Sequence, residues 1–405
     1  MKPARPLILA LNGGSSSIRF GVYRMGGRPA CQLQGKLDRI GVGGSTLRFA
    51  GADGVAHEVA LRAVRDYSSA TKAVLDWLSA RKVFDTLAAV GYRLVHGMGH
   101  TDPELVTPDL LDDLRRIQWV DPDHLPDEIE LIEAVRKHVP SLPHVACFDT
   151  AFHSHMPLVA RMLAIPRRLG EKGVRRYGFH GLSYAYLMLA LARAAGPAAA
   201  KGRVVLAHLG SGASLAAVKD GTGIDTSMGF TPASGMPMGT RSGDIDPGLA
   251  LYLERTEHMT PVQFDAMTKD ASGLLGVSGT SSDIRDLLAR EAVDARAADA
   301  VALFCYQAKK WVGAYAAALG GLDTLVFSGG IGENCAAVRA RICEGLEFLG
   351  VRLDASRNAA NADVISVARS RVTVRVIRTN EEWMVARLTA ARVFADCPPK
   401  GETPE

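Results

Sequence analysis

The stretch LILALNGGSSSIRFGV, residues 7–22, consists of an apolar run, a loop of glycine and serine, and a second apolar run. Residues 204–218, VVLAHLGSGASLAAV, repeat this pattern 197 residues further along the chain. A tight Gly/Ser loop between two strands exposes backbone N–H groups and hydroxyls, which are the donors that a polyphosphate needs. The repeat therefore predicts a duplicated domain whose two copies hold a nucleotide between them.

The composition is that of an ordinary soluble globular protein. Of the 405 residues, 47% are hydrophobic and 22% are charged, and this length is enough for about two or three domains. The net charge of +4 comes without a block of Lys or Arg, so we expect no nucleic-acid partner. The six cysteines form no CxxC pair, which predicts reduced thiols in a cytoplasmic protein.

Apolar runs are short throughout the sequence. No stretch reaches about 18 uninterrupted apolar residues, so we expect no membrane span. The run at residues 6–11 is too short for a signal peptide and lacks a cleavage site. The sequence has no GxxxxGK[ST] pattern, and it has no GxGxxG fingerprint at its first strand. Both facts argue against a P-loop or a Rossmann nucleotide site.

Short apolar runs alternate with segments of helical spacing, so the predicted fold class is α/β. Glycine marks turns heavily in the second half of the chain. We expect strands at 7–11, 18–23, 87–90, 144–148 and 325–327, a loop at 328–334, and helices at 109–120, 126–139, 285–320 and 335–349.

Ten short blocks, each modest evidence by itself, follow one another along nearly the whole chain. They are NGGSSS (12–17), RLVHG (93–97), FDTAFH (148–153), RYGFHG (176–181), HLG (208–210), DTSMG (225–229), MGTRSGDIDP (238–247), SSDIR (281–285), GGIGEN (329–334) and TNEE (379–382). In this order the blocks are highly specific, and the sequence resembles the acetate kinase family, the carboxylate kinases of the acetokinase and butyrate kinase group.

This resemblance implies a duplicated actin/Hsp70-like (ribonuclease H-like) fold with a central nucleotide cleft, and usually a homodimer. The expected domains are 1–150, completed by a helix at about 382–396, and 151–381, followed by a flexible tail at 397–405. The internal repeat is consistent with such a duplication independently of the family.

Transfer of the γ-phosphoryl group of ATP to a carboxylate brings two anions together, so the site must position them and neutralise their charge. A guanidinium binds carboxylate or phosphate with two parallel hydrogen bonds. The resemblance places Arg93 and Arg241 at the acceptor and the transferring group, whereas an isolated arginine in a strand–turn is more often a surface ion-pair partner. Val95, Phe179 and Pro232 fit an apolar acyl pocket.

The resemblance adds Asp149 and His180 to Arg241 as catalytic residues. Asp149 follows a strand, a common position for a site residue in α/β folds, and would align the carboxylate and the magnesium–nucleotide. Its alternative interpretation is a helix N-cap or turn residue. His180 would donate to the transferring phosphoryl oxygens, although a lone histidine in such a block is more often structural. We interpret His153 and two other histidines, His96 and His155, as structural or supporting residues.

Nucleotide and metal contacts also come from the resemblance. Asn12 and Glu381 resemble a magnesium-linked pair, which suits Mg²⁺ because this ion usually keeps several waters and few protein ligands. We expect ATP/ADP with Mg²⁺, and Mn²⁺ as a substitute metal. Asp283 and Arg285 resemble an adenosine-contacting pair. The other predicted nucleotide contacts are Ser15, Ser17, Arg19, His208, Gly210, Ser211, Gly212, Gly330, Ile331, Gly332, Glu333 and Asn334.

Several positions depart from the family pattern. Arg19 stands where the family usually has lysine, Ser211 where it has asparagine, and Tyr184 where it has histidine. In DPDHLPD, residues 121–127, the family commonly has an apolar residue in place of Asp123 and Asn-Pro-Pro after His124. Because this segment borders the acyl pocket, the departure leaves the acyl preference open.

The predicted reaction is acetate + ATP ⇌ acetyl phosphate + ADP, by direct in-line transfer. One alternative is propionate or another short-chain carboxylate as the acceptor. An alternative of another class is a nucleotide-binding clamp without acyl kinase activity. A third is an inactive paralogue, suggested by the departures above, which the presence of Asp149, His180, Arg241 and Glu381 disfavours.

Overall fold

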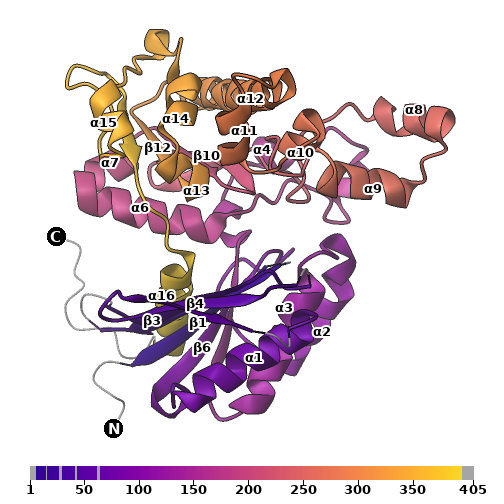
Figure 1. The fold of residues 1–405 in the computed structure, drawn as a ribbon, viewed down its shortest axis with the longest axis vertical. Coiled ribbons are helices and arrows are strands. Elements are labelled where there is room, and N and C mark those ends of the chain that lie inside the picture. The colour runs from indigo at the N-terminus through magenta and orange to yellow at the C-terminus, as the bar shows by residue number, and fades with distance from the viewer. Residues whose placement is uncertain (1–5, 15, 27–29, 42, 62–63, 395–405) are drawn as a thin grey trace. The chain divides into compact units, whose positions relative to one another are not determined.

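In the computed structural model, the chain divides into two compact units (Figure 1). The first unit combines Met1–Ala151 with Asn380–Glu405, and the second is Phe152–Thr379. The chain therefore builds most of the first unit, then the second, and returns to the first with its last helix. The structure describes residues 6–14, 16–26, 30–41, 43–61 and 64–394. The predicted tail at 397–405 and the predicted nucleotide contact Ser15 lie outside these residues.

The described residues of the first unit form an eight-stranded sheet. Its strands are β1 (Leu7–Gly14), β2 (Ser17–Arg24), β3 (Ala30–Asp38), β4 (Thr46–Gly51), β5 (Ala56–Ala60), β6 (Leu87–Leu94), β7 (Glu104–Leu105) and β8 (His144–Phe148). Their order across the sheet is β5-β4-β3-β2-β1-β6-β8-β7. The first Gly/Ser loop joins β1 and β2, which are antiparallel, whereas β1 with β6 and β6 with β8 are parallel.

Helices cover both faces of this sheet. They are α1 (Tyr67–Ala80), α2 (Pro108–Ile117), α3 (Leu125–His138) and α16 (Glu381–Val393), with short 3₁₀ turns η1 (Phe84–Thr86) and η2 (Gln118–Val120). On one face, Leu11 packs in a hydrophobic core with Val74 of α1 and Ile132 of α3. On the other, α16 contacts β1, β6 and β8. Gly91 permits this close approach, because a methyl group there would clash with Thr389 of α16.

The described residues of the second unit form a five-stranded sheet ordered β11-β10-β9-β12-β13. Its strands are β9 (Val204–Leu209), β10 (Ala213–Lys219), β11 (Thr222–Thr226), β12 (Thr324–Ser328) and β13 (Thr373–Val376). The second Gly/Ser loop joins β9 and β10, which are antiparallel, as are β10 and β11. β9 with β12 and β12 with β13 are parallel.

The two sheets share one topology. In each, three antiparallel strands that follow one another along the chain lie beside two further strands that are parallel to the first. Thus β9, β10, β11, β12 and β13 repeat the order and directions of β1, β2, β3, β6 and β8. The predicted α/β fold with two related actin-like domains is confirmed, and each Gly/Ser hairpin occupies the same place in its copy.

Two long helices of the second unit, α6 and α12, pack on its central strands. The helical elements of the described part of this unit are η3 (Ala151–His153), at the junction of the units, α4 (Leu158–Arg161), α5 (Arg167–Gly170), α6 (Gly181–Ala195), α7 (Pro197–Lys201), α8 (Gly248–Glu257), α9 (Pro261–Asp270), α10 (Gly273–Ser278), α11 (Ile284–Arg290), α12 (Ala295–Leu319), α13 (Gly329–Asn334), α14 (Ala336–Cys343), η4 (Glu347–Leu349) and α15 (Ala355–Ala359). α6 packs on β9 and β10 through Leu187 and Leu191, and α12 also contacts these strands.

Three local predictions need correction. The predicted loop at 328–334 is mostly helical, because α13 begins directly after β12 at Gly329, which adopts a left-handed φ of 76°. The predicted helix at 335–349 ends at Cys343, shortly before Gly345, which has a φ of 75°. The predicted helical segment 285–320 is two helices, since Asp294 caps the second of them. Left-handed glycines and side-chain caps both interrupt helices that periodicity alone would extend.

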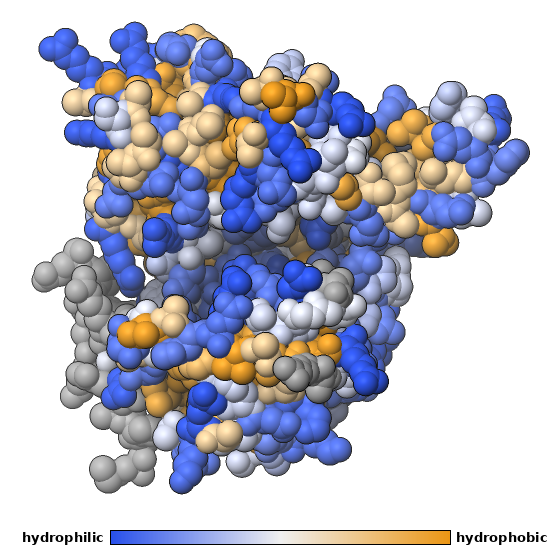
Figure 2. Space-filling model, viewed as in Figure 1, coloured by the Kyte–Doolittle hydropathy of each residue, from blue (hydrophilic) through white to orange (hydrophobic). Residues whose placement is uncertain are grey.

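The surface carries a mixture of residue types. No helix in the described part of the chain is long and apolar enough to cross a membrane. On the face drawn in Figure 2, hydrophilic and hydrophobic residues intermingle over each unit. In the second unit, large apolar side chains are exposed at Leu251 and Tyr252 on α8 and at Val262 on α9. These positions are candidates for contact with another protein chain.

Candidate active site

In the first unit, β6 and β8 bring Arg93 and Asp149 together. The strands are parallel with Leu94 opposite Phe148, and Asp149 directly follows β8. Nε and Nη2 of Arg93 donate to Oδ2 of Asp149 at 2.9 and 2.7 Å, and the Asp149 side chain is fully buried. Burial lowers the pKa of Arg93, but the nearby carboxylates, Asp149 foremost, outweigh it and raise the pKa above its usual value. Arg93, whose side chain is 14% exposed, is therefore a permanent cation that is mostly buried.

Asn12 connects this ion pair to the first turn of α16. Its Oδ1 accepts from Nη1 of Arg93 at 3.3 Å, and its Nδ2 donates to Glu381 Oε2 and Glu382 Oε1, each at 3.1 Å. Asn380 caps α16, since its side chain accepts from the backbone N–H of Trp383. The structure thus brings together the predicted metal pair, Asn12 and Glu381, and adds Glu382.

The donor set around Asn12 suits magnesium. Glu381 and Glu382 place two carboxylates beside the amide nitrogen of Asn12, and carboxylate oxygens are ligands that Mg²⁺ takes from proteins. In the described parts of the chain, no three side chains of His, Cys, Asp or Glu gather into a metal cluster. A magnesium ion held here would therefore take most of its ligands from water and from nucleotide phosphates.

A further buried carboxyl group, Glu128 of α3, lies at the end of β6. The backbone N–H of Val95 donates to both of its oxygens, at 3.2 and 3.1 Å, and Glu128 is 2% exposed. Burial raises the pKa of Glu128 well above its usual value, although Arg93 opposes this shift. Glu128 therefore accepts the backbone N–H at the turn after β6, while Asp149 is the carboxylate that contacts Arg93 directly.

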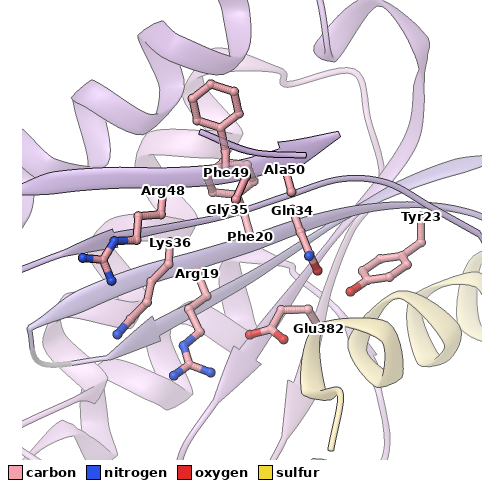
Figure 3. A pocket seen from close by; sticks show the side chains of 11 residues that line it. Arg19, Phe20, Tyr23, Gln34, Gly35, Lys36, Arg48, Phe49, Ala50 and Glu382 are labelled. Carbon is pink, nitrogen blue, oxygen red and sulfur yellow. The ribbon is translucent and has the colours of Figure 1, made fainter. Parts of the chain in front are cut away.

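The predicted nucleotide contact Arg19 lies in a row of cations across the sheet (Figure 3). In the strand pairing, Arg19 is opposite both Asn12 and Lys36, and Lys36 is opposite Arg48. The three cations line a groove of about 350 Å³, whose wall also includes Glu382. Like charges directly opposite each other destabilise a sheet, and Lys36 and Arg48 are each paired with a carboxylate, Asp38 and Glu58 respectively. Arg19 is the cation of the row that lies opposite Asn12.

In the second unit, His180 lies directly before α6 with a left-handed backbone, φ 57° and ψ 23°. This conformation is uncommon for a residue with a side chain, and such strain clusters at functional sites. Nδ1 of His180 is 2.8 Å from Oγ of Ser214, and its ring stacks on that of His208 with centroids 4.3 Å apart. Nδ1 of His208 is in turn 2.8 Å from Oγ of Ser183.

Nitrogen atoms from several segments lie close to the β9–β10 hairpin, because Gly210 and Gly212 have no side chains that would keep them away. A methyl group at Gly212 would lie 3.3 Å from Nε2 of His180 and 3.9 Å from Nη1 of Arg241. A methyl group at Gly210 would lie 3.9 Å from Nε2 of His208 and 3.8 Å from the backbone nitrogen of Gly330. The hairpin thus has imidazole, guanidinium and backbone nitrogens around it, as a phosphate site requires.

Other predicted residues have structural partners of their own. Asp283 caps α11 and pairs with Arg285 at 2.5 Å on an exposed surface. Glu333 accepts from the backbone N–H groups of Gly329 and Thr379, so it ties α13 to the segment that leads out of the unit. Asn334 donates to the carbonyl of Gly330 at 2.9 Å. These contacts stabilise the start of α11 and the helix α13. The roles of these residues in nucleotide binding stay predictions.

The predicted acyl contacts belong to different units. Val95 is in the first unit, whereas Phe179 and Pro232 are in the second, and the carbonyl of Pro232 accepts from Nη1 of Arg241 at 3.3 Å. Val95 and Phe179 are both buried. Asp123, the residue that departs from the family pattern, is exposed in the loop before α3. The structure therefore leaves the acyl preference open.

One protein family matches nearly the whole chain. Its model, the Acetokinase family, covers residues 7–387. The chain belongs to the acetokinase family. An acetate kinase of Rhodopseudomonas palustris (strain ATCC BAA-98 / CGA009) is 43% identical over 94% of this chain and 97% of that protein. A propionate kinase of Citrobacter rodentium (strain ICC168) is 42% identical over 96% of this chain and 98% of that protein.

The fold comparison agrees with this membership. The crystal structure of Porphyromonas gingivalis acetate kinase has a TM-score of 0.85 to this chain at 36% identity, and the match covers 96% of this chain and 100% of that one. Relatives named for two different acids match this acetokinase-family chain almost equally. The membership therefore establishes a kinase of short-chain carboxylates and does not choose the acid.

Sequence reasoning missed several residues of this acetokinase-family site. Glu128 had a usable signal, because it lies on the buried stripe of α3 with Leu125 and Ile132, where a carboxylate is unusual. Glu382 was visible in the TNEE block but received no role. Ser214 had no signal, since its partners are 30 and 34 residues away in the sequence and meet it only in the folded chain.

His153 supports the site and predicts a pH dependence of stability. It is 1% exposed, and its Nε2 donates to the carbonyl of Phe179 at 3.0 Å. Burial lowers the pKa of His153 from 6.5 to about 4. Between these values the unfolded chain binds the proton and the folded chain does not, so the free energy of unfolding falls as the pH falls. The expected loss is about 3 kcal/mol by pH 4.

Urea unfolding at pH 7 and at pH 4.5 measures this effect. Replacing His153 with Gln removes the titrating group, so the variant should lose less stability between the two pH values than the unchanged protein. His57→Gln is the control, because His57 is exposed and its loss should leave the pH dependence unchanged. Equal pH dependence in the unchanged protein and His153→Gln would contradict a buried neutral imidazole.

Proposed function

We propose that this chain transfers the γ-phosphoryl group of ATP reversibly to acetate, giving acetyl phosphate and ADP, by direct in-line attack. The observation that carries the proposal is the convergence of His180 Nε2 and Arg241 Nη1 on the glycine hairpin at Gly212. In the transition state, the transferring phosphoryl group spreads its negative charge over three oxygens, so it needs hydrogen-bond donors and positive charge around it. Family membership supports the same reaction class.

The proposed step moves one phosphoryl group and no proton. A carboxylate oxygen of acetate attacks the γ-phosphorus, and the bond from that phosphorus to the β–γ bridging oxygen breaks. ADP leaves with the electron pair, and the new bond is the mixed anhydride of acetyl phosphate. Arg241 and His180 would neutralise the charge on the transferring group, so the site contributes mostly positioning and electrostatics.

In the first unit, Arg93 would bind the acceptor carboxylate. Its contacts within the described residues use four of its five N–H groups, on Asp149, Asn12 and the carbonyl of Gly13, which leaves one on Nη2. Asp149 would hold the guanidinium in one orientation. Magnesium, held by Glu381 with Asn12 and Glu382, would neutralise the nucleotide phosphates when bound.

The remaining predicted contacts take part in the same proposal. Arg19 would bind the polyphosphate in the first unit. In the second unit, His208 and the backbone of the β9–β10 hairpin would bind it. The α13 residues 330–334, with Asp283 and Arg285, would hold the nucleoside. Ser17, the first residue of β2, and Ser211, in the turn between β9 and β10, would add hydroxyl donors.

A substrate panel tests the function and the choice of acid. Acyl phosphate formed from acetate, propionate and butyrate is trapped as the hydroxamate, and kcat/KM is compared in both directions. We expect acetate to exceed propionate by about tenfold or more, the order that one methylene can contribute in an apolar pocket. A preference for propionate would replace acetate as the acceptor. No hydroxamate from any acid, with ATP still bound, would favour a nucleotide-binding clamp instead.

We further propose a cytoplasmic homodimer. The exposed apolar side chains of Leu251, Tyr252 and Val262 support a second copy as partner. Cys147, Cys305 and Cys343 are buried free thiols, which suits a reducing compartment. Sedimentation analysis of the unchanged protein and of Val262→Asp would test the dimer, because a charge at that position should weaken it.

A further inference from the structure

Three side chains of the second unit form a buried hydrogen-bond chain that ends at His180. The hydroxyl of Tyr184 is 2.5 Å from Oγ of Ser214, and Oγ of Ser214 is 2.8 Å from Nδ1 of His180. Tyr184 and Ser214 are both 0% exposed. Tyr184 lies in the first turn of α6, one turn after His180, and Ser214 lies on β10.

The direction of the protons in this chain follows from the chemistry of the two hydroxyls. Ser214 is fully buried between these two partners, so its one proton is hydrogen-bonded only if Ser214 donates to one of them and accepts from the other. A phenol delocalises its oxygen lone pair into the ring, which makes it a stronger donor and a weaker acceptor than an aliphatic hydroxyl. The favoured arrangement is therefore Tyr184 donating to Ser214, and Ser214 donating to Nδ1 of His180.

This arrangement selects one tautomer of His180. A neutral imidazole has one N–H donor and one acceptor nitrogen, and the hydrogen bond at one nitrogen decides which is which. With Nδ1 accepting from Ser214, the proton of the neutral ring is on Nε2. Nε2 is the nitrogen that lies beside Gly212, where Nη1 of Arg241 also approaches the hairpin.

We propose that Tyr184 is a positioning residue that, through Ser214, holds His180 in its Nε2–H tautomer. This inference rests on the proposed function, in which Nε2 donates to the transferring phosphoryl group. With the other tautomer, Nε2 would turn a lone pair toward phosphoryl oxygens and repel them. Tyr184 stands where the family usually has histidine. In this proposal it positions His180, so its presence does not indicate an inactive protein.

The neighbouring histidine has a chain of the same kind. Nδ1 of His208 meets Oγ of Ser183, and Oγ of Ser183 meets Oγ1 of Thr379, each at 2.8 Å. Ser183 and Tyr184 are consecutive residues, so one turn of α6 contacts Nδ1 of His208 directly and is linked to Nδ1 of His180 through Ser214. The stacked rings are 20° from parallel, so each ring also restricts rotation of the other.

The test removes the phenol hydroxyl and reads the tautomer directly. In Tyr184→Phe, Ser214 loses its donor and becomes free to accept from Nδ1–H of His180. Long-range ¹H–¹⁵N spectra of the full-length protein with labelled histidine distinguish protonated from unprotonated ring nitrogens, and His180→Gln assigns the signal. We expect Nε2–H in the unchanged protein and a shift toward Nδ1–H in Tyr184→Phe.

Kinetics give the second readout. In Tyr184→Phe we expect kcat to fall by about ten- to a hundredfold, up to the loss of one oriented transition-state donor, with KM for ATP within about twofold. Ser214→Ala should give a similar loss, and the double variant should lose little more, because both changes break one chain. Tyr315→Phe is the matched control, since Tyr315 is also buried in this unit and its hydroxyl has no hydrogen-bond partner in the described structure.

The possible results separate the inference from the proposed function. An unchanged tautomer in Tyr184→Phe overturns the inference, whatever happens to kcat. A fall in kcat that Tyr315→Phe shares overturns it as well, because any buried hydroxyl would then have the same effect. A changed tautomer with unchanged kcat supports the positioning role of Tyr184 and removes His180 as the phosphoryl donor.

Discussion

Replacing Arg241 with Ala is expected to lower kcat for acetyl phosphate formation by at least about a thousandfold, since one oriented donor alone contributes about a hundred- to a thousandfold. Arg241 adds a full positive charge to that donor role. Its Nη1 lies beside Gly212 and also donates to the carbonyl of Pro232, so the guanidinium is held in place before substrate binds. Hydroxamate trapping at saturating ATP and acetate measures the loss.

Two companion variants make this expectation specific to the guanidinium. Arg241→Lys keeps the charge but cannot make two parallel hydrogen bonds, so its activity should be intermediate. Arg255→Ala removes an exposed arginine of α8 and should leave kcat unchanged. Turnover of Arg241→Ala at the level of the unchanged protein would remove Arg241 from the site and, with it, the observation on which the proposed function depends.

The duplicated fold could be predicted because its signal is local. An apolar run, a Gly/Ser loop and a second apolar run make a strand, a hairpin and a strand wherever they occur, and the chain contains this pattern twice. The order of the remaining strands depends on contacts between segments far apart in sequence. Residues 328–334 show the limit of local reasoning, because glycines suggested a loop where a helix begins directly after β12.

The candidate site was predicted mainly as a set of residue names. Arg93, Asp149, Asn12 and Glu381 come from four separate segments, and no spacing rule shows that one hydrogen-bond chain joins them. Ser214, which orients His180, is likewise identified only by the fold. The roles of all these residues in catalysis stay predictions that the variants described above can test.

Replacing Asp149 with Asn is expected to lower the free energy of unfolding by about 3 kcal/mol, because it leaves Arg93 charged and mostly buried without its carboxylate partner. Burial raises the pKa of Glu128 well above its usual value, which opposes its ionisation as a replacement counter-charge. Urea unfolding measures the change. Asp38→Asn is the control, because it breaks a partly exposed pair with Lys36 and should cost about 1 kcal/mol or less.

A double variant separates the structural role of this ion pair from its role in the reaction. Replacing Arg93 with Met and Asp149 with Leu exchanges two buried charges for apolar side chains, a change that often leaves stability equal or higher. We therefore expect the double variant to recover most of the stability lost in Asp149→Asn, while hydroxamate formation stays below about a thousandth of the original rate. Recovery of both would mean that the pair only holds β6 and β8 together. Recovery of stability alone would mean that the reaction depends on the Arg93–Asp149 pair itself, as the proposed function requires.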